Sequence, residues 1–275
     1  MKPTKTNIKA AAVTAVAKPV ATGVIDWGNY QGESGFENVQ QSDLGIPFLS
    51  IIQSKSPQFD KTHKDYPTKK IEGVEVGDII NSVTNKVLAK VDKGHILVVP
   101  ATFEKTYNEY KQGRGGLVRI HRNPAVLDDV TGQTDKGEGV LSNGNILAET
   151  SNFYVLLLVE GEEPIPSIIS MASTQLKNGR KWLNIMTGIR VGPNRIQPPA
   201  FSHSYKLSTV IERKDNNAWY GWNIQVNDIN NDGDLVGAAQ SIAKRVANAT
   251  HVALAGGSAP AKLTNGTKDT DEVPM

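Results

Sequence analysis

Short apolar runs bounded by Gly, Pro and Asn dominate the hydrophobic pattern of this chain. Runs of this length between turn-forming residues are typical of β-strands that bury one or both faces. The pattern predicts strands at His95–Pro100, Gly116–His121, Phe153–Val159, Ile165–Met171, Tyr205–Glu212 and Ala218–Val226. No segment repeats at a fixed period, which argues against a solenoid.

The last two of these runs predict a hairpin with Lys214-Asp215-Asn216-Asn217 as its turn. Side chains alternate across a strand, so one face of the second strand carries Ala218, Tyr220, Trp222, Ile224 and Val226. That face is apolar throughout and is expected in the core. The opposite face carries Trp219, Gly221, Asn223, Gln225 and Asn227, which predicts an exposed tryptophan among polar side chains.

Two segments have helical rather than strand periodicity. One begins near Ser173-Thr174 and ends at Gly188, with Leu176, Leu183 and Met186 at helical spacing. The other runs from about Asp234 to Ala253, with an apolar stripe of Leu235, Ala239, Ile242, Val246 and Ala249. The elements together predict a mainly β fold, an open β-barrel of the OB type with an inserted helix, a C-terminal helix and flexible termini. The pattern alone does not separate such a barrel from a sandwich.

The two ends of the chain differ in composition from its middle. Residues 1–23 carry lysines and no acid, which predicts a flexible basic arm; a signal peptide is the alternative, but the stretch Ala10 to Ala17 is only weakly hydrophobic. Residues 256–275 are rich in Gly, Ser, Pro, Thr and Asn, which predicts a disordered acidic tail. The expected division is an arm (1–23), a core (24–230), a C-terminal helix (231–255) and a tail (256–275).

Composition and motifs argue against an enzyme. The chain has 275 residues and 39% hydrophobic residues, as a globular protein does, and no apolar run approaches the roughly 18 residues of a membrane span. The absence of cysteine excludes disulfides, thiolate metal sites and a Cys nucleophile. There is no Walker loop, no G-x-S-x-G and no H-E-x-x-H, and the five histidines are scattered. We therefore expect no catalysis, no metal and no cofactor.

Two motifs resemble ligand loops but favour turns. Asp228–Gly233 matches the start of an EF-hand loop, yet the twelfth position is Ala239 instead of a bidentate Glu, so an Asx-rich turn before the last helix is the preferred interpretation. The glycine-rich stretch Gly113-Arg114-Gly115-Gly116 lacks the spacing of a phosphate loop and is interpreted as a basic turn between strands.

Basic and aromatic residues are concentrated in three segments, although the formal net charge of the chain is only +2. The net charge is +4 over Lys105–Arg122, +5 over Met171–Arg195 and +3 over Lys55–Lys70, so the remainder is strongly acidic. Each segment contains at least one Tyr, Trp or Phe. A solvated charged face explains any one of these segments, but the combination is the one that single-stranded nucleic acid requires.

Cations neutralise phosphates, and aromatic faces stack on unpaired bases without sequence preference. The expected phosphate contacts are Lys105, Lys111, Arg114, Arg119, Lys177, Arg180 and Lys181, and the expected stacking residues are Tyr107, Tyr110, Trp182 and Trp219. Lys177, Arg180 and Lys181 share one side of the first helix at i, i+3 and i+4. The hypothesis requires these residues to form one continuous surface.

Several stretches carry a resemblance to a known family. Phe36-Glu37-Asn38-Val39, Asp43 to Leu49 and Gln53 to Pro57 resemble the amino-terminal segment of single-stranded DNA-binding proteins from tailed bacteriophages. Ser170 to Lys177, followed by Arg180-Lys181-Trp182, is similar to a second signature of that group. The resemblance runs from about Phe36 to Ile224. It implies an OB-type fold, sequence-independent binding of single-stranded DNA, and a role in DNA replication and recombination in the host bacterial cytoplasm.

The tail is similar in kind to the acidic tails through which such proteins engage replication factors. Its candidate partner-binding residues are Asp269, Asp271, Glu272 and Met275, with Met where an aromatic residue is usual. The expected partners are single-stranded DNA and phage or host replication proteins, with a homo-oligomer left open and no membrane. The alternatives are a structural or assembly protein of the virion and an RNA-binding protein, because the residues do not reveal sugar preference.

Overall fold

The computed structural model describes residues 46–255, and within them all side chains except those of Arg114 and residues 249–255. The expected basic arm, the acidic tail with its partner-binding residues, and the stretch from Phe36 to Leu44 lie outside the described residues. The strands are β1 (Leu49–Ile51), β2 (Ile79–Asn81), β3 (Val87–Ala89), β4 (Ile96–Tyr110), β5 (Leu117–His121), β6 (Val130–Gln133), β7 (Gly139–Leu141), β8 (Ile146–Leu158), β9 (Ile165–Ala172), β10 (His203–Lys214) and β11 (Asn217–Ile229). The helices are α1 (Tyr66–Lys69), α2 (Leu176–Gly188) and α3 (Gly233–Ala255), with 3₁₀ turns at Gln112–Arg114, Pro124–Asp129, Ser173–Gln175 and Ala200–Ser202.

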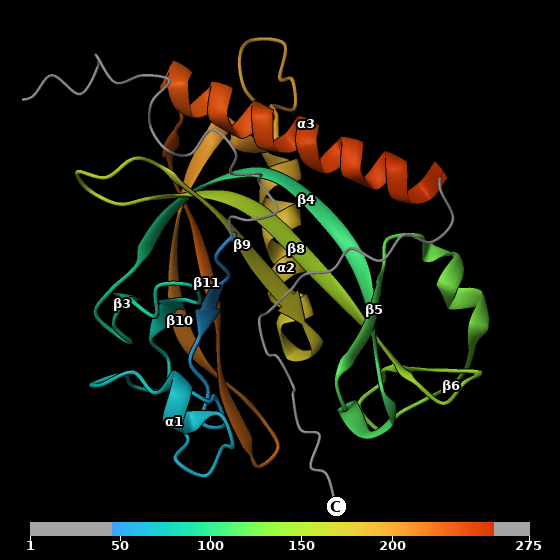
Figure 1. Cartoon of the computed structure of the whole chain (residues 1–275). Helices are drawn as coiled ribbons and strands as arrows, with labels where there is room; N and C mark the ends of the chain where they lie inside the picture. Colours follow the sequence, from blue (N-terminus) through green and yellow to red (C-terminus); the bar gives the residue numbers. More distant parts are fainter. Residues whose placement is uncertain (1–45, 256–275) are drawn as a thin grey trace, which may run out of the picture. The chain divides into compact units, whose positions relative to one another are not determined.

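One curled antiparallel sheet forms the body of residues 46–255 (Figure 1). Its strand order is β11-β10-β4-β8-β7-β6; β5 also pairs with β4, and β9 with β8. The long strands β4 and β8 pair from Leu97↔Leu158 to Tyr110↔Ile146, with a register shift between Pro100 and Thr102. Because β4 pairs with β10 near its start and with β5 near its end, its neighbours diverge and the sheet curls into a half-barrel.

The expected fold class is confirmed: the structure is mainly β, with an open curled sheet, an inserted helix and a C-terminal helix. All six expected strands are present, most of them longer than the apolar runs that predict them. The short strands β1, β2, β3, β6 and β7 are not among the sequence-based expectations, and β1–β2–β3 form a separate small sheet. The division into arm, core, helix and tail stays a prediction.

Alternation along β4 gives the sheet two apolar faces. Val98 belongs to the larger core inside the curl, while its neighbour Val99 belongs to a second core on the other side. Helix α3 covers that second face, packing Ala239 and Ile242 against β4 and β8 (Figure 1). The apolar stripe expected on the last helix therefore packs against the sheet as predicted, at the positions whose side chains the structure describes. At its start the Asp232 carboxylate accepts the backbone N–H of Asp234 and of Leu235, at 2.9 and 3.2 Å, so the Asx-turn interpretation is confirmed.

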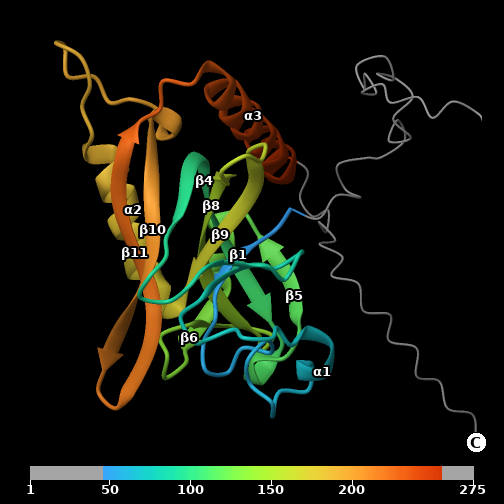
Figure 2. The same ribbon diagram turned by 90° about the vertical axis from the view of Figure 1, so that its left-hand side faces the viewer.

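Helix α2 packs inside the curl, beside β10 and β11 (Figure 2). Its inward residues are Asn178, Gly179 and Trp182. The Trp182 ring lies 4.4 Å from the ring of Phe153 on β8 and 5.7 Å from that of Tyr205 on β10, between centroids, so it joins strands on either side of β4. A Cβ at Gly179 would lie 3.3 Å from the Ser151 Cβ, which shows how closely the helix backbone approaches the sheet.

The structure therefore corrects the expectation for Trp182. Its side chain is 0% exposed, so the ring is part of the core and is not a platform for bases. Tyr205 lies beside this ring in the core, and its own burial raises its pKa to about 12, because the phenolate would be desolvated there. Leu183 and Met186, which recur at helical spacing in the sequence, are only partly buried and border this core.

Replacing Trp182 tests its structural role. Trp182→Ala is expected to lower the free energy of unfolding by about 3–5 kcal/mol, as large core truncations do. Trp182→Phe is expected to lower it by only about 1–2 kcal/mol, because the Trp182 Nε1 is buried without a hydrogen-bond partner among the described residues and its removal relieves that penalty. Urea denaturation followed by circular dichroism measures both values. A loss below 1 kcal/mol for the alanine variant would contradict the packing described above.

Candidate nucleic-acid interface

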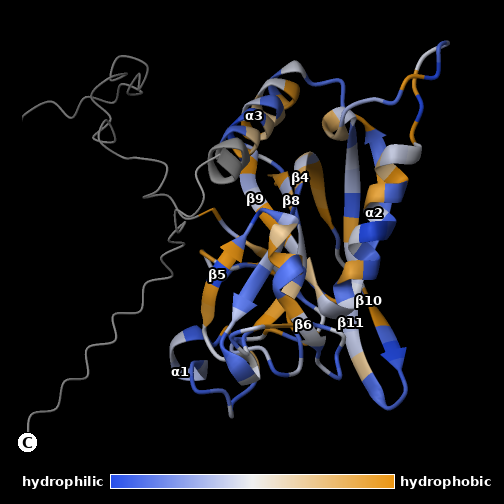
Figure 3. Cartoon of the chain, turned by 90° about the vertical axis from the view of Figure 1, so that its right-hand side faces the viewer, coloured by the Kyte–Doolittle hydropathy of each residue, from blue (hydrophilic) through white to orange (hydrophobic). Residues whose placement is uncertain are grey.

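The outer face of α2 presents three cations to solvent. Lys177, Arg180 and Lys181 are all exposed, while Asn178 and Trp182 point toward the sheet. This arrangement follows from the helical repeat, since positions i, i+3 and i+4 lie on one side and i+1 and i+5 on the other. Figure 3 shows hydrophilic and hydrophobic segments alternating along this helix, beside β10 and β11.

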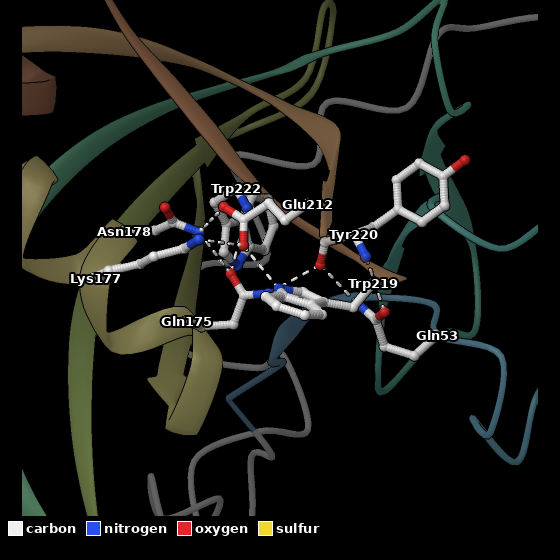
Figure 4. Close-up of polar contacts among 8 residues, drawn as sticks. All are labelled: Gln53, Gln175, Lys177, Asn178, Glu212, Trp219, Tyr220 and Trp222. Atoms are coloured by element: carbon white, nitrogen blue, oxygen red, sulfur yellow. Dashed lines mark hydrogen bonds and ion pairs between the residues drawn. The ribbon is translucent and has the colours of Figure 1, made fainter. Parts of the chain in front are cut away.

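The largely shielded carboxylate of Glu212 connects this helix to Trp219 on β11 (Figure 4). The Trp219 Nε1–H donates to the Glu212 Oε2 at 2.7 Å, and the Lys177 Nζ lies 3.1 Å from the same oxygen. The Asn178 amide donates to the other oxygen, Oε1, at 3.1 Å. The Lys177 Nζ also lies 5.6 Å from the centre of the half-buried Trp219 ring, within reach of a cation–π interaction.

Gly221 makes this arrangement possible. It lies on the same strand face as Trp219, two residues further along β11, and a Cβ there would be 2.5 Å from the Cδ of Glu212 and 2.8 Å from the Nδ2 of Asn178. The carboxylate therefore lies directly over the bare backbone of Gly221. Because the side chain of Glu212 is only 13% exposed, its three donors are needed to compensate for lost hydration.

Two glutamine side chains cover the outer edge of β11 (Figure 4). The Gln53 amide donates to the carbonyl oxygen of Tyr220 and accepts its N–H, at 2.8 and 3.1 Å, as a neighbouring strand would. The Gln175 amide donates to the same carbonyl at 2.8 Å and accepts the N–H of Trp222 at 3.3 Å. Gln53 and Gln175 belong to two of the stretches on which the family resemblance rests, so those stretches meet at this edge.

A second group of charges lies on β4, β5 and β8. Lys105, Tyr107 and Glu109 alternate along one face of β4, and Arg119 of β5 pairs opposite Glu109. Paired residues of antiparallel strands project to the same side, so Arg119 shares this face. The Lys105 Nζ lies 3.1 Å from the Oε1 of Glu149 on β8, and the Arg180 Nη2 lies 3.9 Å from it. Glu149 therefore joins the β4 face to the basic face of α2.

Glu109 is held in its ionised form. Burial opposes ionisation, but hydrogen bonds donated by Asn145 and Asn143 and the short contact with His121 together outweigh it and lower the pKa of this carboxyl. The His121 Nε2 lies 2.7 Å from the Glu109 Oε2. The stabilisation from Glu109 is thus present above its unfolded pKa and is lost as pH falls through the lowered folded value.

On the other face of β4, Arg122 of the same basic segment forms an ion pair within the protein. The Arg122 Nε donates to the Glu104 Oε1 at 2.8 Å, and the Tyr154 Oη donates to the Oε2 at 3.0 Å. Burial, followed by the nearby Glu104 charge, raises the pKa of Tyr154 to about 12. The +4 charge of Lys105–Arg122 is therefore divided between two faces of the sheet, because successive strand residues point in opposite directions.

The structure brings together some of the expected site residues and corrects others. Lys177 and Trp219 are neighbours, and Lys105 and Arg180 share Glu149. The prediction that Tyr107 is exposed for stacking is wrong, because its side chain packs against Leu141 and Leu147 and is only 8% exposed. The remaining expected residues are exposed Lys111, Arg119 and Lys181, half-buried Tyr110, and Arg114, whose side chain lies outside the described ones.

A sequence model of the Pam3 phage gp34-like proteins matches residues 13–252. The chain belongs to the Pam3 phage gp34-like family. It is therefore a phage protein, and the family description assigns no ligand. No curated protein and no solved structure matches the chain significantly.

Two kinds of feature are absent from the part of the chain that the structure describes. Among the described residues, no helix is both long enough and apolar enough to span a bilayer. Over the same part of the chain, no three His, Asp or Glu side chains gather in a way that could hold a metal ion.

Four residues of this arrangement were not predicted from the sequence as site residues: Gln53, Gln175, Asn178 and Glu212. Glu212 could have been found from the hairpin register, since a turn between Lys214 and Asn217 places Glu212 opposite Trp219. The two glutamines and Asn178 had no such signal, because amide side chains meet the edge of β11 only after the chain has folded.

Gly221→Ala tests the contact between α2 and the β10–β11 hairpin. The added methyl group is expected to displace the Glu212 carboxylate and leave its donors unpaired, lowering the free energy of unfolding by about 1–3 kcal/mol. Urea denaturation gives this value, and the emission of Trp219 is expected to change with it. Gly116→Ala is the matched control, because a Cβ there meets open space. Equal stabilities of the two variants would contradict the role of Gly221.

Proposed function

We propose that this phage protein binds single-stranded DNA without sequence preference during replication and recombination in the host bacterial cytoplasm, and that it is not an enzyme. The observation that carries the proposal is a row of exposed cations. It begins on the outer face of α2, with Lys177 beside Trp219 and then Arg180. It continues onto the sheet through Lys105 of β4 toward Arg119 of β5. The phage family and the curled mainly β sheet are consistent with it.

The ion pairs along this row do not prevent phosphate binding. The side chains of Lys177, Arg180 and Lys105 are 58%, 67% and 45% exposed, and ion pairs of exposed cations contribute roughly 0–1 kcal/mol. A polyanion that contacts several cations at once, and releases their counterions, can therefore replace these carboxylates.

Trp219 is the principal stacking candidate of the row. Its indole N–H is fixed by Glu212, so the orientation of the ring is set before a ligand arrives. A fixed ring loses little conformational freedom when a base stacks on it, and stacking contributes roughly 1–3 kcal/mol per base. Half-buried Tyr110 also keeps exposed surface, but it follows Glu109 on β4 and therefore points to the opposite face of the sheet from this row.

Titration of tryptophan fluorescence with oligo-dT, oligo-rU and duplex DNA at two salt concentrations tests the proposal. We expect quenching by oligo-dT with an affinity that falls steeply as salt increases, because bound phosphates release counterions. Stronger binding of oligo-rU would favour the RNA-binding alternative. No quenching by any of the three, together with salt-insensitive self-association, would favour a virion assembly protein.

A triple substitution locates the phosphate contacts within that assay. Lys177→Ala, Arg180→Ala and Lys181→Ala together are expected to reduce the slope of log K against log salt by about 2, since each lost phosphate contact on a single strand removes about 0.7. The matched control is Lys93→Ala, Lys244→Ala and Arg245→Ala, which removes the same charge from exposed positions outside the three basic segments. Equal slopes for the two variants would contradict the role of α2.

The tail is the second part of the proposal. We propose that its acidic residues, including Asp269, Asp271 and Glu272, occupy the basic surface in the absence of DNA and engage replication proteins when DNA displaces them. Deleting residues 262–275 is then expected to tighten binding of oligo-dT severalfold at low salt, because a competing anion is removed. Unchanged or weaker affinity in the fluorescence titration would contradict autoinhibition by the tail.

A further inference from the structure

A pocket of about 580 Å³ adjoins the proposed DNA path. Its apolar walls include Tyr107, Leu127, Val130, Leu147 and Leu176, which come from β4, the 3₁₀ turn Pro124–Asp129, β6, β8 and the start of α2. The volume lies within the range of small-molecule sites, which is roughly 300–1,000 Å³. Tyr107 closes the pocket from the sheet side, where it packs against Leu147 and Leu141.

The charged groups of the pocket are two cations and two carboxylates. Arg180 lies on the α2 side and Lys136 on the β6–β7 turn, and the carboxylates are those of Glu138 and Glu149. Glu149 is already compensated by Lys105 and Arg180. Apolar walls with cations and carboxylates around them suit a flat heterocycle that carries N–H groups on its edge and an anionic group at its attachment point.

A nucleobase in a single strand has this chemistry. Its ring can lie against apolar side chains, its edge N–H groups can donate to carboxylates, and the adjacent phosphate can contact Arg180 or Lys136. Arg180 also belongs to the cation row of the proposed path. The pocket therefore adjoins the cation row at Arg180.

We propose that this pocket takes one unstacked nucleobase from a bound single strand, an inference that rests on the proposed function. The pocket anchors the strand at one nucleotide, while the exposed cations contact the phosphates on either side. Tyr107, whose ring is too buried to stack on a passing strand, forms part of the base pocket instead. Any base that can leave its stack is accepted, so the absence of sequence preference is retained.

The test compares a dT 12-mer with an abasic 12-mer of equal length and charge. Wild-type protein is expected to bind the dT 12-mer at least tenfold more tightly, since the enclosed base and the base stacked on Trp219 each contribute roughly 5- to 150-fold in affinity. Thr174→Trp, at an exposed position that lines the pocket, is expected to reduce this preference about tenfold by filling the pocket. Its binding of the abasic 12-mer is expected to be unchanged.

Thr187→Trp is the matched control, because Thr187 is exposed near the end of α2 and does not line the pocket. Gln133→Trp, which fills the pocket from β6, repeats the test if Thr174→Trp folds poorly by circular dichroism. An unchanged preference for the dT 12-mer in both pocket variants would overturn the pocket proposal alone. Equal binding of the two 12-mers by the wild type would overturn both the pocket and the stacking role of Trp219. Failure of the wild type to bind either 12-mer would overturn the proposed function as well.

Discussion

The orientation of the basic face of α2 depends on the packing of one tryptophan against the inside of the curled sheet. Trp182 contacts rings from β8 and β10, which lie on either side of β4, so it holds two parts of the curl at a fixed separation. The close approach of Gly179 to Ser151 lets the ring reach that depth. Because the inner face of α2 is fixed in this way, its outer face presents Lys177 and Arg180 in one orientation.

The electrostatics follow from the same packing. Each of the exposed cations lies next to an acid from a different element. Lys177 pairs with Glu212 of β10, and Arg180 and Lys105 both lie near Glu149 of β8. The acids are the less exposed members of these pairs, and they orient the cations without enclosing them. A chain that is nearly neutral overall can in this way present cations to a ligand while the opposite charges stay within the sheet surface.

Local patterns in the sequence were sufficient for most of the fold. Apolar runs located the six long strands, and the stripe containing Ala239 and Ile242 located α3 together with its buried face. Patterns failed where long-range packing decides. Trp182 lies at a helical spacing compatible with either the core or the surface, and only the position of Phe153 places it in the core. Tyr107 is enclosed by Leu141 and Leu147, from strands that meet it only in the folded sheet.

The edge of β11 has a consequence for how copies of the protein can be arranged. An uncovered edge strand offers its backbone groups to a strand from another molecule, and lateral β-sheet association follows. Gln53 and Gln175 occupy those groups at Tyr220 and Trp222. Neighbouring molecules therefore cannot fuse their sheets through this stretch of backbone.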